Sequence, residues 1–317
     1  LKTDWLKLEQ YCNITPFQSF NWQKTWYLTI GSKRKIKPFI VKVYLKEKCI
    51  AIFPFCMKKN ILKLIYWNGG IQTDYNIPLI HNDFYNLENL ENIWNSVLKK
   101  IQPYDLIMLN KIPEFINGNK NLFINLIKTK YLSSSYQLIL NNDNFKKLKN
   151  KKIIKDNNRQ IRRLKELGDL KFEIAINKKQ REEVIEKMII QKSYRYKTTN
   201  SWDMFSEREN IDFYKHFNGN LNAISYLQYS CIKLNNEIIA THFGFYDNKN
   251  FYYLMPSFDL HKYYIYSPGK ILLEYLIEWA KNNNIKIFDF TVGNENYKKI
   301  WSNHDFNVYD YENSGSF

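Results

Sequence analysis

The segment from Tyr266 to Ile271, YSPGKI, is the strongest local indication of binding chemistry in the sequence. Ser267 suits a helix N-cap, Pro268 suits the first helical position, and Gly269 has no side chain to block an approaching ligand. The free N–H groups of such a first turn, together with Lys270, form a site for an anion such as phosphate. An ordinary well-capped helix uses the same residues, so the segment is either an anion site or simply the start of a helix.

Three further residues have side chains suited to proton transfer or to anion binding. His242 lies in the predicted strand ATHFGF and would titrate near neutrality. It is a candidate general base, or else a half-buried histidine of a sheet. Asp289 alternates with apolar neighbours on a predicted buried strand, so its carboxylate needs a partner. It would orient a base or pair with Lys298, which is itself either a second anion contact or a solvated side chain.

Several other kinds of site are excluded by their missing motifs. The sequence contains no H-E-x-x-H, G-x-x-x-x-G-K-[ST], G-x-S-x-G or G-x-G-x-x-G. The remaining histidines have no metal-ligand spacing with any cysteine, so no metal site is predicted. The four cysteines form no C-x-x-C pair, and reduced thiols in a cytosol are the simpler interpretation.

The composition predicts a folded protein and says little about partners. The chain of 317 residues is 44% hydrophobic and 17% aromatic and carries a formal net charge of +16. Only seven of its 47 basic residues are arginines, and abundant lysine and asparagine reflect an A/T-rich codon bias. No apolar run approaches the roughly 20 residues of a spanning helix, and no signal peptide is evident. We therefore expect a soluble, cytoplasmic protein.

The hydrophobic patterns predict alternating strands and helices along the whole chain. In the first half we expect strands at 38–45, 48–57, 61–67, 104–110 and 136–140, and helices at 5–11, 18–29, 87–101 and 119–130. In the second half we expect strands at 172–177, 223–234, 237–247, 251–258, 285–292 and 306–311, and helices at 178–194, 202–218 and 268–282, with a short helix from Asn296. The expected fold class is α/β, of the α+β kind, with mixed central sheets flanked by helices.

A basic amphipathic helix is predicted at the boundary between the two halves. From Lys146 to Lys171 there are eleven basic and three acidic residues. Lys151, Lys155, Arg159 and Arg162 fall on one stripe of a helical wheel, opposite an apolar face, and Gly168 suits the C-terminal stop. The stripe is either a solvated face or an anion-binding surface.

The second half resembles the GNAT N-acyltransferase superfamily, and specifically the bacterial subgroup associated with cellulose and exopolysaccharide biosynthesis, which is related to the Fem-type peptidyltransferases. The resemblance spans about 150 to 304 and depends on four segments, RRL followed by Gly168, EIIATHFGF (237–245), YSPGKILLEYLIEWA (266–280) and FDFTVGNENYKKIW (288–301). The first half is similar to the N-terminal region of the same subgroup through PFQSFNWQKTW (16–26), AIFPF (51–55) and Asp74-Tyr75.

The resemblance implies an acyl-CoA-dependent N-acyltransferase, most simply an N-acetyltransferase. It implies that the CoA pyrophosphate lies against the helix after the fourth strand, where only Gly269 of the usual glycines is present. It also implies that His242 faces the reacting groups, that Tyr297 protonates the leaving thiolate, and that Asp74 and Tyr75 belong to a substrate-binding region. The acceptor would be the amine of a small molecule or of a cell-envelope or polysaccharide precursor, and an acyl carrier protein could replace CoA.

The expected organisation is two GNAT-like lobes, a degenerate one at 1–144 and the acyltransferase lobe at 145–317. Two alternative functions remain open. A Fem-type transferase would take its acyl group from aminoacyl-tRNA and would bind tRNA phosphate through the basic helix, but no long coiled-coil insertion is evident. A non-enzymatic nucleic-acid-binding protein would need arginine-rich patches, and seven arginines are few, so we do not expect nucleic acid as a partner.

Overall fold

The computed structural model describes residues 1–59, 61–217, 221–223 and 225–315. The chain forms two compact units. The first unit comprises 1–135, 292–294 and 305–317, and the second comprises 136–291 and 295–304. These units differ from a simple division after residue 144, because the chain returns to the first unit near its C-terminus. Two predicted element positions, Asn218 and Ile224, lie outside the described residues.

The first unit is built on a mixed sheet. Its strands follow the order β1-β2-β3-β5-β14, in which β3 and β5 are parallel and the other pairs are antiparallel. Its elements are α1 (Lys2–Glu9), α2 (Phe20–Trp26), β1 (Lys37–Leu45), β2 (Lys48–Lys59), β3 (Lys63–Trp67), β4 (Leu79–Ile80), α3 (Leu87–Ile101), β5 (Leu106–Pro113), β6 (Phe115–Ile116), β7 (Asn119–Lys120) and β14 (His304–Ser314).

Helices cover both faces of this sheet because its strands carry apolar side chains on both sides. On one face, α3 contributes Trp94 and Val97 to a core that contains Phe53 and Phe55 of β2. Ile52, the residue before Phe53, points to the other face and belongs to a smaller cluster with residues of α1. The alternation along β2 follows the two-residue period of a strand.

The strands of the second unit follow the order β8-β13-β12-β11-β10-β9. The central pair, β12 and β13, is parallel, whereas β9 to β12 pair antiparallel. Its elements are the end of β8 (Thr129–Ile139), α4 (Asn142–Lys149), α5 (Lys152–Leu167), β9 (Leu170–Ile174), α6 (Lys178–Thr198), α7 (Arg208–His216), β10 (Tyr226–Leu234), β11 (Glu237–Tyr246), β12 (Asn250–Phe258), α8 (Pro268–Asn282), β13 (Ile287–Val292) and α9 (Asn296–Trp301).

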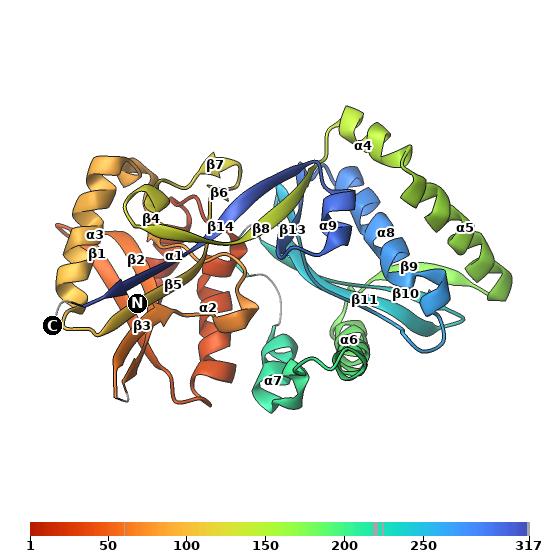
Figure 1. The fold of residues 1–317 in the computed structure, drawn as a ribbon, viewed down its shortest axis with the longest axis horizontal. Coiled ribbons are helices and arrows are strands. Elements are labelled where there is room, and N and C mark those ends of the chain that lie inside the picture. The colour runs from red at the N-terminus through yellow and green to blue at the C-terminus, as the bar shows by residue number, and fades with distance from the viewer. Residues whose placement is uncertain (60, 218–220, 224, 316–317) are drawn as a thin grey trace. The chain divides into compact units, whose positions relative to one another are not determined.

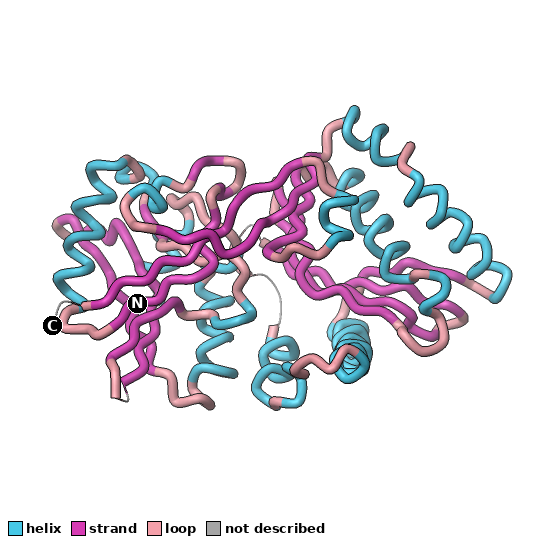
Figure 2. Tube along the Cα trace, in the orientation of Figure 1, coloured by secondary structure: helices cyan, strands magenta, loops and turns pink. Residues whose placement is uncertain are grey.

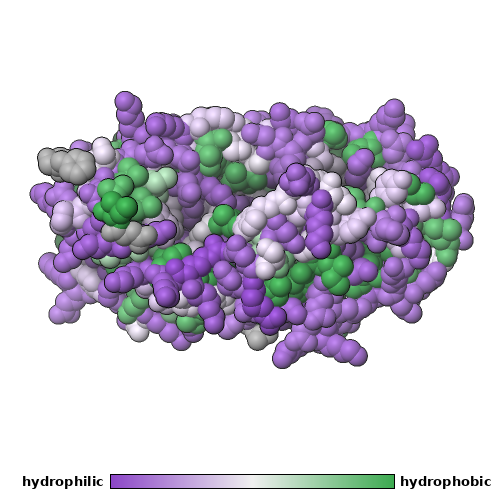
Figure 3. Space-filling view, turned by 60° about the horizontal axis from the view of Figure 1, so that its bottom comes forward, coloured by the Kyte–Doolittle hydropathy of each residue, from purple (hydrophilic) through white to green (hydrophobic). Residues whose placement is uncertain are grey.

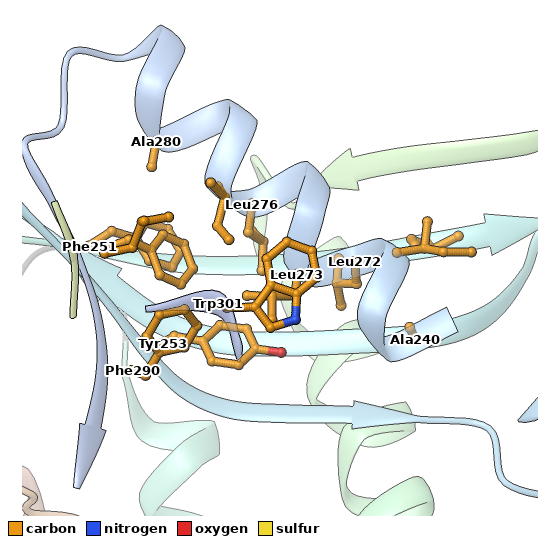
Figure 4. Close-up of a cluster of buried hydrophobic side chains, with 14 of the residues drawn as sticks. Ala240, Phe251, Tyr253, Leu272, Leu273, Leu276, Ala280, Phe290 and Trp301 are labelled. Carbon is orange, nitrogen blue, oxygen red and sulfur yellow. The ribbon is translucent and has the colours of Figure 1, made fainter. Parts of the chain in front are cut away.

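Helices also lie on both faces of this part of the sheet (Figures 1 and 2). Helices α8 and α5 lie on one face, and α6 and α7 lie on the other. The core under α8 contains Phe251, Tyr253 and Phe290 from the strands, with Trp301 from α9 (Figure 4). On the opposite face the ring of Phe243 in β11 packs against that of Tyr214 in α7. The predicted mixed α/β fold class is confirmed.

Most predicted elements are present, and one prediction is wrong. The helices at 87–101 and 268–282 have the predicted bounds. The helix predicted at 119–130 is absent, because β7, a 3₁₀ turn at Leu122–Asn125 and the start of β8 occupy these residues.

The surface is rich in hydrophilic side chains, as the charged composition predicts. The face drawn in Figure 3 is mostly hydrophilic, and its apolar side chains gather in separate patches. Within the described residues, no helix has both the length and the apolar character that crossing a bilayer requires.

Candidate active site

The parallel strands β12 and β13 of the second unit pair over only three residues. Their register runs from Asn250 opposite Ile287 to Tyr252 opposite Asp289. Strand β12 then continues to Phe258 and β13 to Val292, with no further pairing between them among the described residues. Backbone groups beyond this point are therefore available to a ligand, as at other places where neighbouring parallel strands separate.

Helix α8 begins close to the end of β12. A Cβ placed on Gly269 would lie 2.6 Å from Cδ1 of Phe258, the last residue of that strand. Because real Cβ atoms do not approach a ring so closely, glycine is required here for the helix to pack on the strand. The packing explains Gly269 without a ligand, and it also places the helix N-terminus where the two strands have separated.

The first turn of α8 has fewer free N–H groups than a standard helix. Pro268 has no N–H group, and the amides of Lys270 and Ile271 donate to the carbonyl of Ser267 at 2.9 and 3.3 Å. Ser267 itself is left-handed, with φ of 52°, and its side chain does not cap the helix. The amide of Gly269 and the exposed side chain of Lys270 are what this turn offers to an anion.

Helix α5 adds a cation near the same turn. The guanidinium of Arg163 lies 4.8 Å from the ring centroid of Tyr266, which directly precedes Ser267. The helix is fixed in place by Asn157, whose side-chain amide donates to the carbonyl of Lys270 at 3.2 Å and to Glu274 at 2.8 Å. The segment from Tyr266 to Ile271 is therefore flanked by two basic side chains, Arg163 and Lys270.

Of the predicted stripe on the same helix, Lys155, Arg159 and Arg162 are exposed. Arg159 has one weak partner, Asp156, at 3.8 Å. The helix ends at Leu167 as predicted, and Gly168 has φ of 153°. The amphipathic helix is confirmed, whereas anion binding by Arg159 and Arg162 stays a prediction.

His242 lies in β11 and is completely buried. Its ring stacks on that of Tyr253 with centroids 4.8 Å apart, and its Nδ1 is 3.5 Å from Oγ of Ser230. Its Nε2 has no hydrogen-bond partner in the described part of the chain. Burial lowers the pKa of His242 to about 3, so its imidazole is neutral at physiological pH. The role of His242 as a base stays a prediction. It requires that the substrate reach the imidazole, which the surrounding core side chains cover.

Asp289 is buried at the last paired position of β13, and its carboxylate is held by two donors. Oδ2 accepts a hydrogen bond from the side-chain amide of Gln137 at 2.8 Å, and Oδ1 accepts one from the backbone N–H of Thr291 at 2.7 Å. Thr291 has a positive φ of 58°, which turns the chain away immediately after Asp289. Through these hydrogen bonds Asp289 connects β13 to Gln137 of β8 and fixes the backbone at Thr291, at the point where β12 and β13 separate.

Tyr297 and Lys298 lie in α9, directly after β13. Tyr297 is half-buried, and its ring lies 6.4 Å from that of Phe290, the first β13 residue beyond the paired segment. Lys298 is 3% exposed, and its Nζ lies 3.1 Å from a carboxylate oxygen of Glu295 and 3.4 Å from the carbonyl of Thr291. Both predicted residues are thus near the separation of the strands.

Sequence analysis missed Lys192, a half-buried residue of α6. Desolvation, followed by repulsion from Arg195, lowers the pKa of Lys192 to about 8, with a smaller repulsion from Lys298 and an attraction to Glu295. No local pattern marks this lysine, because Glu295 and Lys298 are distant in sequence.

Asp74 and Tyr75 belong to the first unit. Asp74 forms an ion pair with Lys111 at 3.2 Å, and Tyr75 is 2% exposed, with its phenol bonded to the hydroxyl of Ser135. Trp22 and Trp26 of α2 fix the same loop through hydrogen bonds to Thr73 at 2.9 Å and to Gln72 at 3.0 Å. Two of the quoted segments, 16–26 and Asp74-Tyr75, therefore meet in one buried polar network. Substrate binding by Asp74 and Tyr75 stays a prediction.

Among the described residues, no three His, Cys, Asp or Glu side chains lie together so that they could hold a metal ion. All four cysteines, Cys12, Cys49, Cys56 and Cys231, are free thiols.

Comparison with known proteins identifies the fold of the site. Residues 151–299 match a family model described as an acetyltransferase (GNAT) domain. No match was found among curated proteins. The matched segment contains the separating strands, the start of α8 and the residues of α9 up to Lys299.

Three solved structures are similar over most of the chain. FemX aligns with a TM-score of 0.65 at 10% identity, covering 98% of this chain and 96% of that one. A conserved protein of unknown function from Bacteroides thetaiotaomicron aligns at 0.58 and 11% identity, with coverages of 98% and 96%. The structure of L-PGS from Bacillus licheniformis aligns at 0.52 and 12% identity, with coverages of 86% and 83%. At these identities the likeness shows the fold alone.

Proposed function

We propose that the protein transfers an acyl group from the thioester of an acyl-CoA, in the simplest case acetyl-CoA, to an amine. The observation that carries the proposal is the separation of β12 from β13 beyond Tyr252 and Asp289, with the start of α8 packed against Phe258 at the end of β12. The GNAT acetyltransferase domain matched at 151–299 supports the same chemistry. The acceptor is the amine of a small molecule or of a cell-envelope or polysaccharide precursor, a choice based on the sequence resemblance.

The second unit has more to offer the acyl-thioester end of the donor than its phosphate end. An extended acyl-thioester arm fits between the separated strands, where backbone groups of β12 beyond Tyr252 are available for hydrogen bonds. The phosphate end would be held by the amide of Gly269 and by the side chains of Lys270 and Arg163. This is a smaller set of donors than a helix N-terminus with all its amides free.

Proton transfer is the second requirement of the reaction. The attacking amine must lose a proton, and the departing thiolate gains one. Tyr297 is the best-supported acid, because it is half-buried next to Phe290, where the strands separate. His242 and Asp289 remain the candidate bases, although burial keeps the imidazole neutral and two donors hold the carboxylate. A base could thus also be an ordered water or the acceptor's own neutral amine.

A second candidate function is a Fem-type transferase that takes its acyl group from aminoacyl-tRNA. It is favoured by the scarcity of free amides at the start of α8 and by the exposed basic stripe of Lys155, Arg159 and Arg162 on α5. An ester donor would use the same separation of the strands without needing a pyrophosphate site. A purely nucleic-acid-binding role has no comparable support.

Calorimetric titration with acetyl-CoA, longer acyl-CoAs, an acylated carrier protein and aminoacyl-tRNA distinguishes these donors. We expect acyl-CoA to bind, and Lys270→Ala to weaken binding about 10-fold through loss of a charged contact. Lys299→Ala, at an exposed lysine of α9, is the matched control. Saturable binding of aminoacyl-tRNA at physiological salt, lost in the triple charge reversal of the α5 stripe, would instead establish the Fem-type donor.

A further inference from the structure

Strand β1 is an edge of the sheet in the first unit. It pairs with β2 alone, and its backbone from Phe39 to Leu45 bonds to no other segment among the described residues. In an antiparallel pair, every second residue of a strand directs its N–H and C=O groups away from its partner. The outer side of β1 therefore presents unpaired donors and acceptors, to which an extended chain can add as a further strand.

A groove of about 340 Å³ lies between this edge and helix α3. It is lined by six consecutive residues of β1, from Phe39 to Tyr44, and by Ser96, Val97 and Lys100 of α3, the helix labelled beside β1 in Figure 1. Because consecutive strand residues point to opposite faces, a groove lined by all six follows the edge of the sheet. Six residues of strand extend about 20 Å, which is the length of a short extended peptide.

The lining of the groove is apolar and basic, and no acidic residue of the described chain belongs to it. Val97 is part of the core beneath the groove, whereas Ser96 and Lys100 are exposed. Lys42 has Asp4 as an ion-pair partner at 2.8 Å, but Lys100 has no acidic partner among the residues that the structure describes. A chain with apolar side chains and a carboxylate therefore complements this groove.

We propose that β1 and α3 bind an extended, acidic segment of another protein, which adds to the sheet beside β1. Backbone hydrogen bonds to β1 supply affinity, apolar side chains enter the groove, and a carboxylate pairs with Lys100. A second copy of this edge is a poor occupant, because it would bring Lys42 and Lys100 of two chains together as like charges. The inference is independent of the proposed acyl transfer.

Calorimetry with blocked hexapeptides tests the charge of the surface on the full chain. We expect a peptide that alternates glutamate and valine to bind, and one that alternates lysine and valine to show no measurable binding. Lys100→Glu should weaken binding of the glutamate peptide about 5-fold or more, because an ion pair becomes a repulsion. Lys99→Glu, at an exposed lysine outside the groove, makes the same change in net charge and should bind nearly as the parent does.

A second pair of variants tests the shape of the groove. Ser96→Trp places a large ring at an exposed position that lines the groove, and it should abolish binding of the glutamate peptide. Asn95→Trp adds the same ring at the neighbouring exposed position of α3, outside the groove, and should leave binding unchanged. Both positions face solvent, so neither variant disturbs the core.

Amide hydrogen exchange detects the added strand. The bound glutamate peptide should slow exchange in β1 and leave it unchanged in β9, the strand at the other end of the sheet order. No binding of this peptide, equal binding of the two peptides, or binding without slower exchange in β1 overturns the inference. A dimer of the chain in sedimentation that is lost in Ser96→Trp would make a second copy the occupant, and it overturns the inference as well.

Discussion

The buried imidazole of His242 makes a measurable prediction about stability in acid. Its pKa is lowered to about 3 by burial, from the 6.5 that a solvated histidine has. The folded protein therefore keeps His242 neutral down to about pH 3, whereas the unfolded chain takes up a proton below about pH 6.5. The contribution of neutral His242 to the free energy of unfolding is fully present above pH 6.5 and is lost as the pH falls towards 3.

The magnitude follows from the linkage between protonation and folding. Each pH unit below 6.5 removes about 1.4 kcal/mol from the free energy of unfolding, so two units, from pH 6.5 to pH 4.5, remove about 2.7 kcal/mol. His242→Gln has no group to protonate at this position. We expect the variant to be less stable than the parent at pH 7, because its ring no longer stacks on Tyr253, and to lose about 2.7 kcal/mol less on acidification.

Amide hydrogen exchange in β11 gives the opening free energy of the second unit directly. It is measured by mass spectrometry at pH 7 and pH 4.5 and corrected for intrinsic exchange rates. The parent and the variant share every other titrating group, so those groups cancel in the difference. His216→Gln, at an exposed histidine of α7, is the matched control. A difference below about 0.5 kcal/mol between parent and His242→Gln would refute the reasoning from burial.

The same residue gives a kinetic result that bears on its proposed role as a base. If His242 accepts the proton of the amine, His242→Ala should lower the acyl-transfer rate about 100-fold and remove the acid limb of the pH–rate profile. If the burial of the ring persists during turnover, an acid limb between pH 5 and pH 7 belongs to another group and survives the substitution. The two outcomes separate a catalytic histidine from a core one.

Three other substitutions test separate features. Gly269→Ala should lower the thermal midpoint, at a cost of about 1–3 kcal/mol, because its Cβ would lie 2.6 Å from the ring of Phe258; an unchanged midpoint would mean that the helix shifts freely. Tyr297→Phe should slow acyl transfer while donor affinity stays within about twofold, as measured by single-turnover kinetics and calorimetry; equal rates would assign the leaving-group proton elsewhere. Burial raises the pKa of Glu9 to about 7, so the stability from its protonated form is present below pH 4.5 and is lost as the pH rises through 7. Glu9→Gln should flatten this dependence by about 3 kcal/mol in chemical denaturation, and an unaltered slope would contradict it.

The helices that could be predicted well were those whose pattern depends only on local residues. The helix at 87–101 has a regular apolar face, and the helix at 268–282 has a proline at its first position, so their bounds were predicted correctly. The wrong helix at 119–130 follows an Asn-Gly pair, in which Asn117 and Gly118 have φ of 50° and 83°. This dipeptide favours a two-residue hairpin turn, and it was the available signal for β6 and β7.

The candidate site could be predicted only in part, because its geometry depends on contacts between distant residues. The sequence located Tyr297 and Lys298 near the end of a buried strand, and both lie there. It could not show that the phenol of Tyr75 would bond to the hydroxyl of Ser135, or that burial would lower the pKa of Lys192. These outcomes depend on how α6, β13 and separate loops pack, which no local pattern encodes.

The start of α8 shows why a motif and a binding site should be argued separately. Pro268 and Gly269 were expected to leave room and free amides for a phosphate, yet the glycine is required by Phe258, and the amides of Lys270 and Ile271 donate to Ser267. A substitution at Gly269 would therefore disturb packing and binding together, so loss of donor affinity in such a variant would not identify a phosphate site. Lys270 does not have this ambiguity, because its exposed side chain lies at the same turn and its removal leaves the helix contact intact. The donor of the reaction is best determined through that lysine.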